Sequence, residues 1–261
     1  NRCTFRPNRF IILKMLNIVT VCFNDLKGLK ATYNSIQDSL SQKVRWIVID
    51  GCSTDGSVSY LDSVSSENIF IISEEDEGLY DAMNKGMKYA SQGWIWFLNA
   101  GDTATQDAFS VLNFSTEEYD LIYGDAFDIV NDEIHLKKAA NPKKNARKMF
   151  THHQAIFYSV SFLFSNKITY DLRYKIASDY DLTSKVLLLS PRIHYLSIAV
   201  CVFDTPRISK FSKDSFREWK AIKRMYYGRY FFRPNYLELK LKFILKMKTP
   251  SLYYKFKNLR K

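Results

Sequence analysis

The sequence predicts an α/β fold in which a single Rossmann-like mixed sheet is flanked by helices and followed by a basic helical extension. Apolar runs of strand length alternate with segments of helical periodicity. Two of these runs end in a polar, glycine-containing loop that carries an aspartate. The net charge of +11 is concentrated at the C-terminal end, and 46% of the residues are hydrophobic, enough to bury a substantial core.

The chain is expected to divide into a basic N-terminal extension (1–14), one α/β domain (15–209) and a basic, aromatic-rich helical tail (210–261). Its four cysteines are widely scattered and form neither a CxxC motif nor a Cys/His cluster. We therefore expect no zinc site and no disulfide framework, and a reducing cytoplasm fits. No apolar run approaches the length of about 18 residues that a membrane-spanning helix needs, so no such helix is predicted.

The α/β domain begins with the order strand, helix, strand. The residue pattern predicts strands over Leu16–Cys22 and Arg45–Asp50 and a helix over Leu26–Leu40. An acid at a strand end is typical of the first half of a nucleotide-binding unit, and the Asp50 carboxylate can accept a hydrogen bond from a base N–H or a ribose hydroxyl. Ordinary turn chemistry in the loop GCSTDGS is the alternative.

The stretch Ser73–Asp102 is the centre of the predicted site. It starts with a cluster of acids and turns at Gly78. The expected elements leading to it and through it are a helix over Ser57–Ser63, a strand over Ile69–Ile72, a helix over Tyr80–Ala90 and a strand over Trp94–Leu98. Ligands of open α/β sheets bind beyond the carboxyl ends of strands, where Asp102 can hold a divalent cation.

This stretch also carries a family resemblance. GLYDAMNKG followed by WIWFLNAGD resembles the core signature of family 2 glycosyltransferases of the GT-A fold, in the bacterial branch that builds capsule, colanic acid and O-antigen repeats. The likeness covers roughly residues 16–209. The segments VCFN and IDGCSTDGS resemble the strand–YN and VDDGSTDGS pair of the family. The resemblance implies that Val21, Phe23 and Asp50 line the base and ribose pocket, with Gly51 where the family often has a second aspartate.

The resemblance also implies a metal ligand. Asp102 matches the last acid of the DxD-like family pattern, while Asn99 and Gly101 replace the other two. One carboxylate with phosphate oxygens and waters suffices for Mn²⁺ or Mg²⁺. By the same resemblance Asp81 lies near the sugar and Lys85 near the diphosphate. Because these two residues are one helical turn apart, a surface ion pair is the alternative.

Two later segments supply the remaining candidates. THHQAIFY resembles the family's His-Gln dipeptide, which implies that His153 touches phosphate or acceptor; a structural histidine is the alternative, and two adjacent histidines alone do not make a metal site. The segment YDLRYKIASDYDL resembles the one that supplies the catalytic carboxylate, which implies that Asp179 is the base and Asp181 the second choice. Ser178 or Asp179 is also a candidate helix N-cap.

The rest of the α/β domain contains less specific signals. The expected features are a strand over Asp120–Gly124, a hairpin over Ala126–Leu136, a basic segment over Asn141–Met149, and a last strand over Ile193–Phe203. The basic segment is either a mobile loop near the acceptor or a solvated charge run. After the last strand, the residues Thr205–Ser209 replace the GGxS loop of the family, and Arg207 is a candidate phosphate ligand.

The tail is strongly basic. Residues 207–261 hold 17 Lys and Arg against three acids, a net of +14, which leaves −3 for the remainder of a chain whose total is +11. Basic residues alternate with aromatic and apolar ones at helical spacing, which suits an anionic membrane surface. Nucleic-acid binding and a helical appendage packed on the core are the alternatives.

The resulting expectation is an inverting glycosyltransferase that uses a nucleoside-diphosphate sugar and a lipid-linked saccharide acceptor in surface polysaccharide synthesis. Asp179, with an ordinary pKa, would take the acceptor proton. The enzyme is expected in the cytoplasm, peripheral at the inner face of the plasma membrane, with no nucleic-acid partner. A nucleotidyltransferase of similar architecture is an alternative, although FNDLKGLK matches a phosphate loop poorly. A basic nucleic-acid-binding protein is the other.

Overall fold

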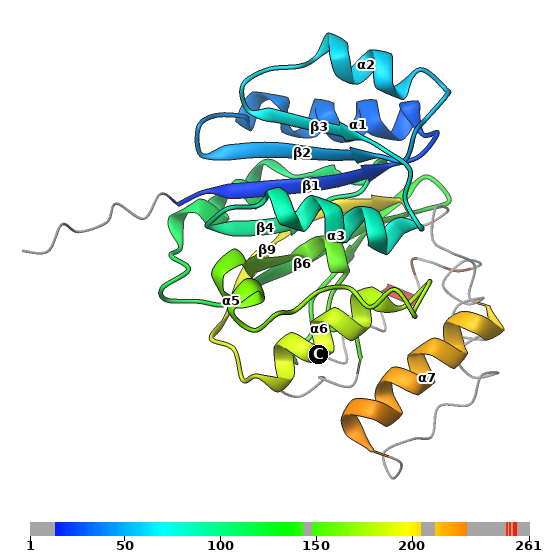
Figure 1. The fold of residues 1–261 in the computed structure, drawn as a ribbon. Coiled ribbons are helices and arrows are strands. Elements are labelled where there is room, and N and C mark those ends of the chain that lie inside the picture. The colour runs from blue at the N-terminus through cyan, green and yellow to red at the C-terminus, as the bar shows by residue number, and fades with distance from the viewer. Residues whose placement is uncertain are drawn as a thin grey trace, which may run out of the picture.

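The computed structural model describes residues 14–142, 148–204 and 212–228, together with 249, 251, 253 and 254 (Figure 1). The expected N-terminal extension, Arg207 with its loop, and most of the tail beyond residue 228 lie outside the described residues, as does part of the basic segment 141–149. No helix among the described residues is long and apolar enough to cross a membrane.

Four parallel strands form one half of the sheet, in the order β3-β2-β1-β4 (Figure 1). The elements of this half are β1 (Leu16–Cys22), α1 (Leu26–Ile36), η1 (Gln37–Ser39), β2 (Val44–Asp50), α2 (Ser57–Ser63), β3 (Ile69–Ser73), α3 (Leu79–Tyr89) and β4 (Trp94–Phe97). They confirm the strands and helices predicted there, with α1 ending in a 3₁₀ turn. The backbone N–H groups of Leu98 and Ala100 donate to the carbonyls of Val19 and Val21, so the chain after β4 runs alongside β1.

The second half of the sheet is mixed. Strand β8 is antiparallel to β4 and β6, and β9 is parallel to β6. The elements are β5 (Thr103–Ala104), η2 (Gln106–Asn113), β6 (Leu121–Val130), β7 (Glu133–Lys137), η3 (His153–Ala155), β8 (Ile156–Ser159), α5 (Val160–Ser165), α6 (Ser178–Leu188), β9 (Ile193–Asp204) and α7 (Lys213–Tyr227). The described residues form one sheet of nine strands, and its mixture of parallel and antiparallel pairs confirms the predicted mixed sheet.

The hairpin predicted around Asn131 and Asp132 is present, with φ angles of 52° and 62° at these two residues. The prediction of a separate strand over Asp120–Gly124 is wrong in one respect. The strand is present, but it continues without a break as β6 into the first strand of the hairpin. The pairing of β6 with β9 shifts register beside Gly124, which marks a β-bulge. A Cβ at Gly124 would lie 2.7 Å from Cγ1 of Val200, so the two strands approach closely there.

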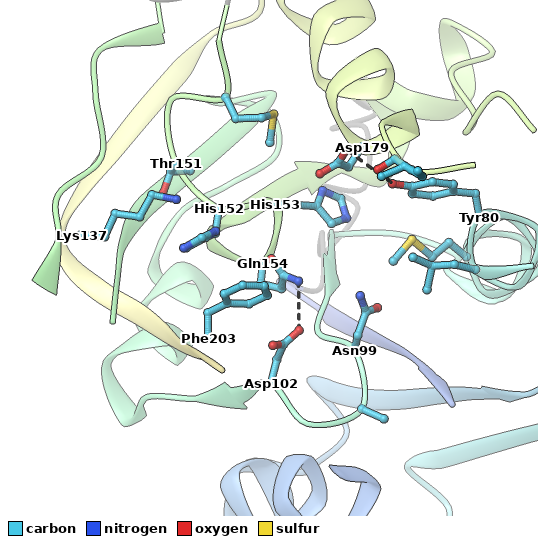
Figure 2. A pocket seen from close by; sticks show the side chains of 15 residues that line it. Tyr80, Asn99, Asp102, Lys137, Thr151, His152, His153, Gln154, Asp179 and Phe203 are labelled. Carbon is cyan, nitrogen blue, oxygen red and sulfur yellow. Dashed lines mark hydrogen bonds between the residues drawn. The ribbon is translucent and has the colours of Figure 1, made fainter. Parts of the chain in front are cut away.

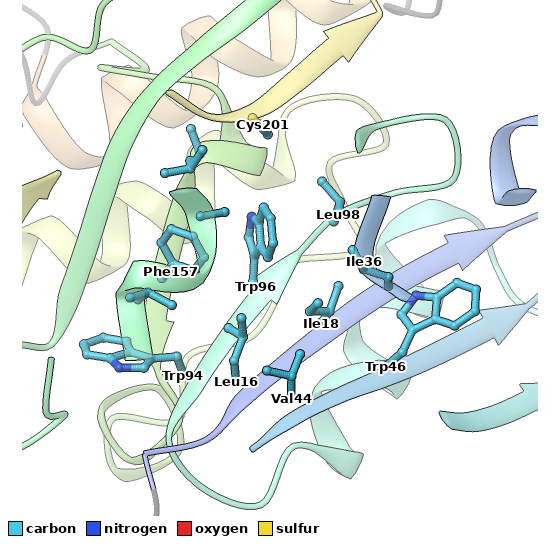
Figure 3. Packing of buried hydrophobic residues seen from close by; sticks show 14 of the residues in the cluster. Leu16, Ile18, Ile36, Val44, Trp46, Trp94, Trp96, Leu98, Phe157 and Cys201 are labelled. Atoms are coloured by element: carbon cyan, nitrogen blue, oxygen red, sulfur yellow. The ribbon is translucent and has the colours of Figure 1, made fainter. Parts of the chain in front are cut away.

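Each face of the sheet has its own hydrophobic core. One core contains Trp46, Trp94, Trp96 and Phe157 and is covered by α1, α2 and η2 (Figure 3). The other is covered by α3, α5 and α6. The three tryptophans are fully buried. Because both faces of the sheet are covered, its strands are continuous apolar runs rather than alternating ones.

Gly86 allows α3 to lie close to β1. A Cβ at this position would collide with Cγ1 of Val19 and would lie 3.4 Å from Cγ1 of Ile49. We expect Gly86→Ala to lower the free energy of unfolding by about 1–3 kcal/mol, because overpacking a filled core displaces the helix. Urea denaturation measures this change. Lys88→Ala, on the exposed side of the same helix, is the control with an expected change within about 0.5 kcal/mol, and an unchanged midpoint for Gly86→Ala contradicts the prediction.

The helix α7 confirms a helix in the basic tail. Ser212 caps it, and its side chain and that of Ser215 form a reciprocal capping box. Ile222 is fully buried, and Trp219 packs against Tyr180 of α6. This part of the tail is thus a helical appendage packed on the core.

Candidate active site

A cavity of about 530 Å³ lies beyond the carboxyl end of β4 (Figure 2). Four of the residues predicted for the site line it: Asn99, Asp102, His153 and Asp179. The lining residues that the sequence did not single out include Tyr80, Lys137, Thr151, His152, Gln154 and Phe203. The cavity is therefore built from both halves of the sheet, from η3 and from the starts of α3 and α6.

Asp102 is held in place by its turn and by a neighbour from η3. The turn after β4 closes through the N–H of Asp102, which donates to the carbonyl of Asn99 at 3.0 Å. The hydroxyl of Thr32, on α1, donates to the carbonyl of Asp102 at 2.7 Å. Nε2 of Gln154 donates to Oδ2 of Asp102 at 3.0 Å and so orients the carboxylate (Figure 2). Only 5% of the surface of Asp102 is exposed.

The oxygen atoms at this turn suit a hard divalent cation. The Oδ1 atom of Asn99 is buried and has no hydrogen-bond partner among the described residues. The Asp102 carboxylate provides oxygen donors at the cavity, the atom type that Mn²⁺ and Mg²⁺ prefer. The described residues contain no cluster of three His, Cys, Asp or Glu side chains that could hold a metal ion. The donor set therefore fits a cation that takes its other ligands from substrate and water.

Asp179 lies in the first turn of α6 and faces the cavity (Figure 2). Its carboxylate accepts from the N–H of Tyr180 at 2.7 Å and lies 3.5 Å from the hydroxyl of Tyr80. Burial raises the pKa of Asp179 to about 6. The expectation of an ordinary pKa is therefore wrong. The N-cap expectation is also wrong, because Ala177 occupies that position.

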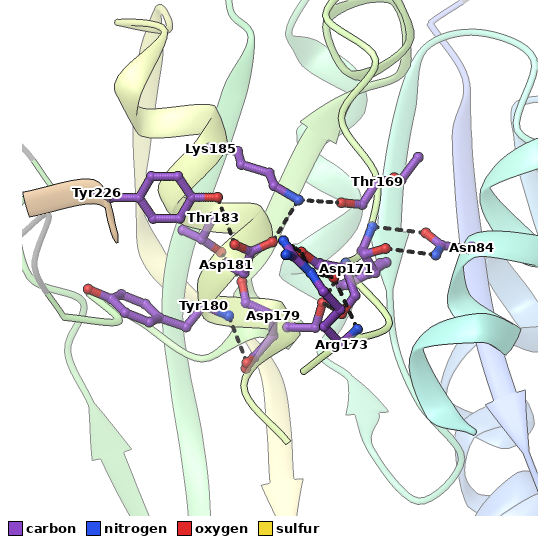
Figure 4. Close-up of polar contacts among 12 residues, drawn as sticks. Asn84, Thr169, Asp171, Arg173, Asp179, Tyr180, Asp181, Thr183, Lys185 and Tyr226 are labelled. Atoms are coloured by element: carbon purple, nitrogen blue, oxygen red, sulfur yellow. Dashed lines mark hydrogen bonds and ion pairs between the residues drawn. The ribbon is translucent and has the colours of Figure 1, made fainter. Parts of the chain in front are cut away.

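Asp181 is also buried but is not among the cavity-lining residues. Nζ of Lys185 lies 2.7 Å from its Oδ2, and the hydroxyl of Tyr226, on α7, donates to its Oδ1 at 2.7 Å (Figure 4). The hydrogen bond from Tyr226 holds α6 to α7, whereas the ion pair with Lys185 lies within α6. Of the two acids, only Asp179 faces the cavity.

The two adjacent histidines have different surroundings. His153 is buried, its Nε2 is 2.8 Å from the hydroxyl of Tyr170, and its ring stacks on Phe97. Desolvation lowers the pKa of His153 to about 3, so the ring is neutral at physiological pH. His152 also lines the cavity, and its Nε2 contacts the buried carboxylate of Asp128. The contact of His153 with phosphate or acceptor stays a prediction.

The residues predicted for the base and ribose lie beside the cavity, at the ends of β1 and β2. The Asp50 carboxylate is buried, accepts from the N–H of Ser53 at 2.9 Å, and leaves Oδ1 without a hydrogen-bond partner among the described residues. Phe23 is 66% exposed, whereas Val21 is buried. A Cβ at Gly51 would lie 2.7 Å from Oδ2 of Asp76, so an acid from the next loop occupies the space beside this glycine.

Asp81 and Lys85 are not among the cavity-lining residues. Nζ of Lys85 lies 3.4 Å from Oδ2 of Asp81 and 3.1 Å from Oε1 of Glu74. Asp81 and Lys85 therefore form the ion pair that was the alternative prediction. Glu74 is a second acid that pairs with Lys85 and connects the loop before α3 to the helix. Their assignment to sugar and diphosphate stays a prediction.

Most of the lining residues that the sequence did not single out lie inside the two motif segments. Gln154 follows the two histidines directly, and its place within THHQ was the one available signal. Tyr80 lies within GLYDAMNKG, where the sequence singled out only Asp81 and Lys85. Lys137 and Phe203 reach the cavity from β7 and β9, which neighbour β6 in the sheet but are far apart in the chain.

Comparison with known sequences identifies relatives of the chain. Residues 17–173 match the model of the family described as glycosyl transferase family 2. An uncharacterised glycosyltransferase of Mycobacterium tuberculosis is 30% identical over 212 residues, which are 77% of this chain and 79% of that protein. A PGL/p-HBAD biosynthesis glycosyltransferase of Mycobacterium bovis is 30% identical over 182 residues, 67% and 68% of the two chains.

Solved structures share the fold. TarS of Staphylococcus aureus (residues 1–349) in complex with UDP aligns with a TM-score of 0.66 and 19% identity, over 89% of this chain and 70% of that one. The mannosyltransferase PcManGT of Pyrobaculum calidifontis, in complex with GDP-Man and Mn²⁺, aligns with a TM-score of 0.55 and 13% identity, over 94% and 73%. The chain belongs to glycosyltransferase family 2 and is a glycosyltransferase with the GT-A fold.

Proposed function

We propose that the protein is an inverting, metal-dependent glycosyltransferase. It would move a sugar from a nucleoside-diphosphate sugar to a hydroxyl of a lipid-linked saccharide, in surface polysaccharide synthesis of the capsule, colanic acid or O-antigen type. The observation that carries the proposal is the position of Asp179 and Asp102 on one cavity, with the end of β1 beside it. A base and an oxygen-rich turn thus face the same space, which is large enough for a sugar.

Asp179 is proposed to act as the general base. With a pKa of about 6 its carboxylate is ionised above neutral pH and can accept the proton of an acceptor hydroxyl. The Tyr180 N–H fixes one side of the carboxylate, so the group points toward the cavity. The deprotonated hydroxyl then attacks the anomeric carbon from the side opposite the leaving diphosphate, and a single displacement inverts the configuration.

Asp102 is proposed to hold Mn²⁺ or Mg²⁺, with the side-chain oxygen of Asn99 nearby. When bound, the cation supplies positive charge for the leaving diphosphate. Gln154 keeps the carboxylate in one orientation through its hydrogen bond. The complex of PcManGT with Mn²⁺ supports this part of the proposal by likeness of fold.

The nucleotide is proposed to bind beside the cavity, on Val21, Phe23 and Asp50. The exposed ring of Phe23 can stack on a base, and the free oxygen of Asp50 can accept from a ribose hydroxyl or a base N–H. TarS with UDP and PcManGT with GDP-Man support a nucleotide-sugar donor.

The acceptor and the location are proposed from the surface of α7. Lys213, Arg217, Lys220 and Arg224 are exposed at helical spacing on this helix. Such a surface suits anionic lipid headgroups, which would place the enzyme in the cytoplasm, peripheral at the inner face of the plasma membrane, next to a lipid-linked acceptor.

The donor is tested with the purified full chain, Mn²⁺ and a panel of UDP-, GDP- and dTDP-sugars. We expect metal-dependent turnover of one donor, and a product whose anomeric configuration, read by proton NMR, is opposite to that of the donor sugar. Retention of configuration contradicts the single displacement. Absence of turnover and of donor binding for every member of the panel, by a folded protein, contradicts the proposed function.

A further inference from the structure

The helix α7 has two different faces. Its exposed face carries basic side chains, whereas Glu218, Trp219, Ile222 and Tyr226 face the core. Trp219 and Ile222 pack with Ala177 and Tyr180 at the start of α6. The helix therefore covers the segment that precedes Asp179 (Figure 1).

Glu218 binds that segment through its backbone. Oε1 accepts from the N–H of Lys175 at 2.9 Å, and Oε2 accepts from the N–H groups of Ile176 and Ala177, each at 2.9 Å. Hydrogen bonds from N–H groups to a carboxylate are about twice as strong as those between neutral groups. Three successive peptides therefore converge on one side chain from another helix.

The same segment is held from the opposite side. The hydroxyl of Tyr80, on α3, donates to the carbonyl of Ile176 at 2.8 Å. Glu218 thus fixes the N–H of this residue while Tyr80 fixes its carbonyl. Ile176 and Asp179 both line the cavity, so the orientation of these peptides determines where the carboxylate of Asp179 points.

The N-cap residue of helix α6, Ala177, has no side-chain oxygen to accept the free N–H groups at the helix start. Glu218 binds just before that first turn, because the N–H groups that it accepts belong to Ala177 and to the two residues before it. Glu218 supplies an anionic acceptor at this end, where the helix dipole favours negative charge.

We propose that Glu218 is a positioning residue that fixes the peptides of residues 175–177 and thereby the carboxylate of Asp179. The C-terminal helix is then part of the active site. This inference rests on the proposed function only for the role of Asp179 as the base.

The charge of Glu218 separates this role from a purely structural one. The titratable groups near Asp179 include Tyr80, Tyr158, Tyr170 and Glu218. Other titratable groups line the same cavity: Asp102, Lys137, His152 and His153. Burial raises the pKa of each tyrosine, so the three are neutral at physiological pH. Removing the negative charge of Glu218 should therefore lower the pKa of Asp179 while hydrogen exchange outside residues 175–177 stays at the wild-type rate. Partial unfolding would also lower this pKa, because Asp179 would lose its burial, but it would speed hydrogen exchange throughout α6.

The experiment compares the full chain with its Glu218→Gln, Glu218→Asp and Asp214→Asn variants. Asp214 is an exposed acid on the same helix whose described ion pair is with Arg217, so it serves as the matched control. Two quantities are measured: hydrogen exchange of the amides of residues 175–177, and kcat and KM for the donor between pH 4.5 and 8.5.

For Glu218→Gln we expect hydrogen exchange of the amides of residues 175–177 to be about 10-fold faster, because these amides lose their acceptor. We expect kcat to be about 10- to 100-fold lower, because a misplaced base loses most of its catalytic effect. The KM of the donor should stay near the wild-type value. The fall of kcat at low pH, its acidic limb, should move to lower pH. Glu218→Asp, which keeps the charge on a shorter side chain, should lie between wild type and Glu218→Gln in exchange and kcat, with its acidic limb unshifted.

A folded Glu218→Gln variant with wild-type exchange and kcat overturns the inference, as does a loss of kcat without a shift of the acidic limb. If Glu218→Gln fails to fold, Glu218→Asp decides by hydrogen exchange and kcat alone, and a folded Glu218→Asp variant with wild-type exchange and kcat overturns the inference. If wild type turns over no donor, the proposed function fails, while the exchange measurement still tests the contact of Glu218 with residues 175–177.

Discussion

Asp179→Asn is expected to lower kcat about 10²- to 10⁴-fold, because the amide cannot take a proton from the acceptor hydroxyl. The KM of the donor should change little, since the proposed donor contacts at Asp102 and Asp50 are intact. Steady-state kinetics at pH 8 with saturating acceptor measures both quantities. Asp171→Asn is the control, because Asp171 pairs with Arg173 and is not among the cavity-lining residues. A kcat within a few-fold of wild type for Asp179→Asn contradicts the role of Asp179.

The same substitution is expected to stabilise the fold at alkaline pH. The pKa of Asp179 is about 6 in the folded protein, against 3.8 for an aspartate exposed to water, so the free energy of unfolding falls as pH rises through this window. The amide avoids that cost. Because Asp179 keeps contact with the open cavity, we expect a gain of about 1–2 kcal/mol at pH 8 and none near pH 3, measured by urea denaturation.

Asp102→Ala is expected to lower kcat about 10²- to 10³-fold and to raise the Mn²⁺ concentration needed for half-maximal activity. The substitution removes the one carboxylate at the turn after β4, and charge on the leaving diphosphate is then poorly neutralised. Titration of kcat with Mn²⁺ measures the change.

Asp107→Ala is the matched control for Asp102, because Asp107 is an exposed acid in η2. It should behave as wild type. Metal-dependent turnover that survives Asp102→Ala with an unchanged Mn²⁺ requirement contradicts the proposed metal site.

The sequence predicted the parallel half of the fold and the turn that carries Asp102. Both depend on local information, because apolar strands with polar loops at their carboxyl ends place those loops at one edge of a sheet. The same reasoning indicated Asn99 and the end of β2. Asp179 was predicted by the resemblance of its segment to a family segment; it lines the cavity, and its role as the base stays a prediction.

Other parts of the site depend on contacts between distant segments. Gln154 reaches Asp102 because β8 pairs with β4, and Glu218 reaches residues 175–177 because α7 packs on α6. Neither contact has a spacing that a sequence motif could reveal. The resemblance singled out His153 and passed over His152, although both line the cavity, because the sequence does not show that β8 and β9 bring His152 to it. The raised pKa of Asp179 arises from burial, which a sequence pattern does not quantify.

The pH dependence of kcat tests the central role of Asp179 most directly. For wild type at saturating donor and acceptor, we expect kcat to be flat above pH 7 and to fall tenfold per pH unit below a pKa of about 6, because protonation of Asp179 removes the base. This fall of kcat at low pH should be absent from the residual activity of the Asp179→Asn variant and should persist in the Asp181→Asn variant. A kcat independent of pH between 4.5 and 8.5, or a limb that remains in Asp179→Asn, would contradict the assignment of Asp179 as the base.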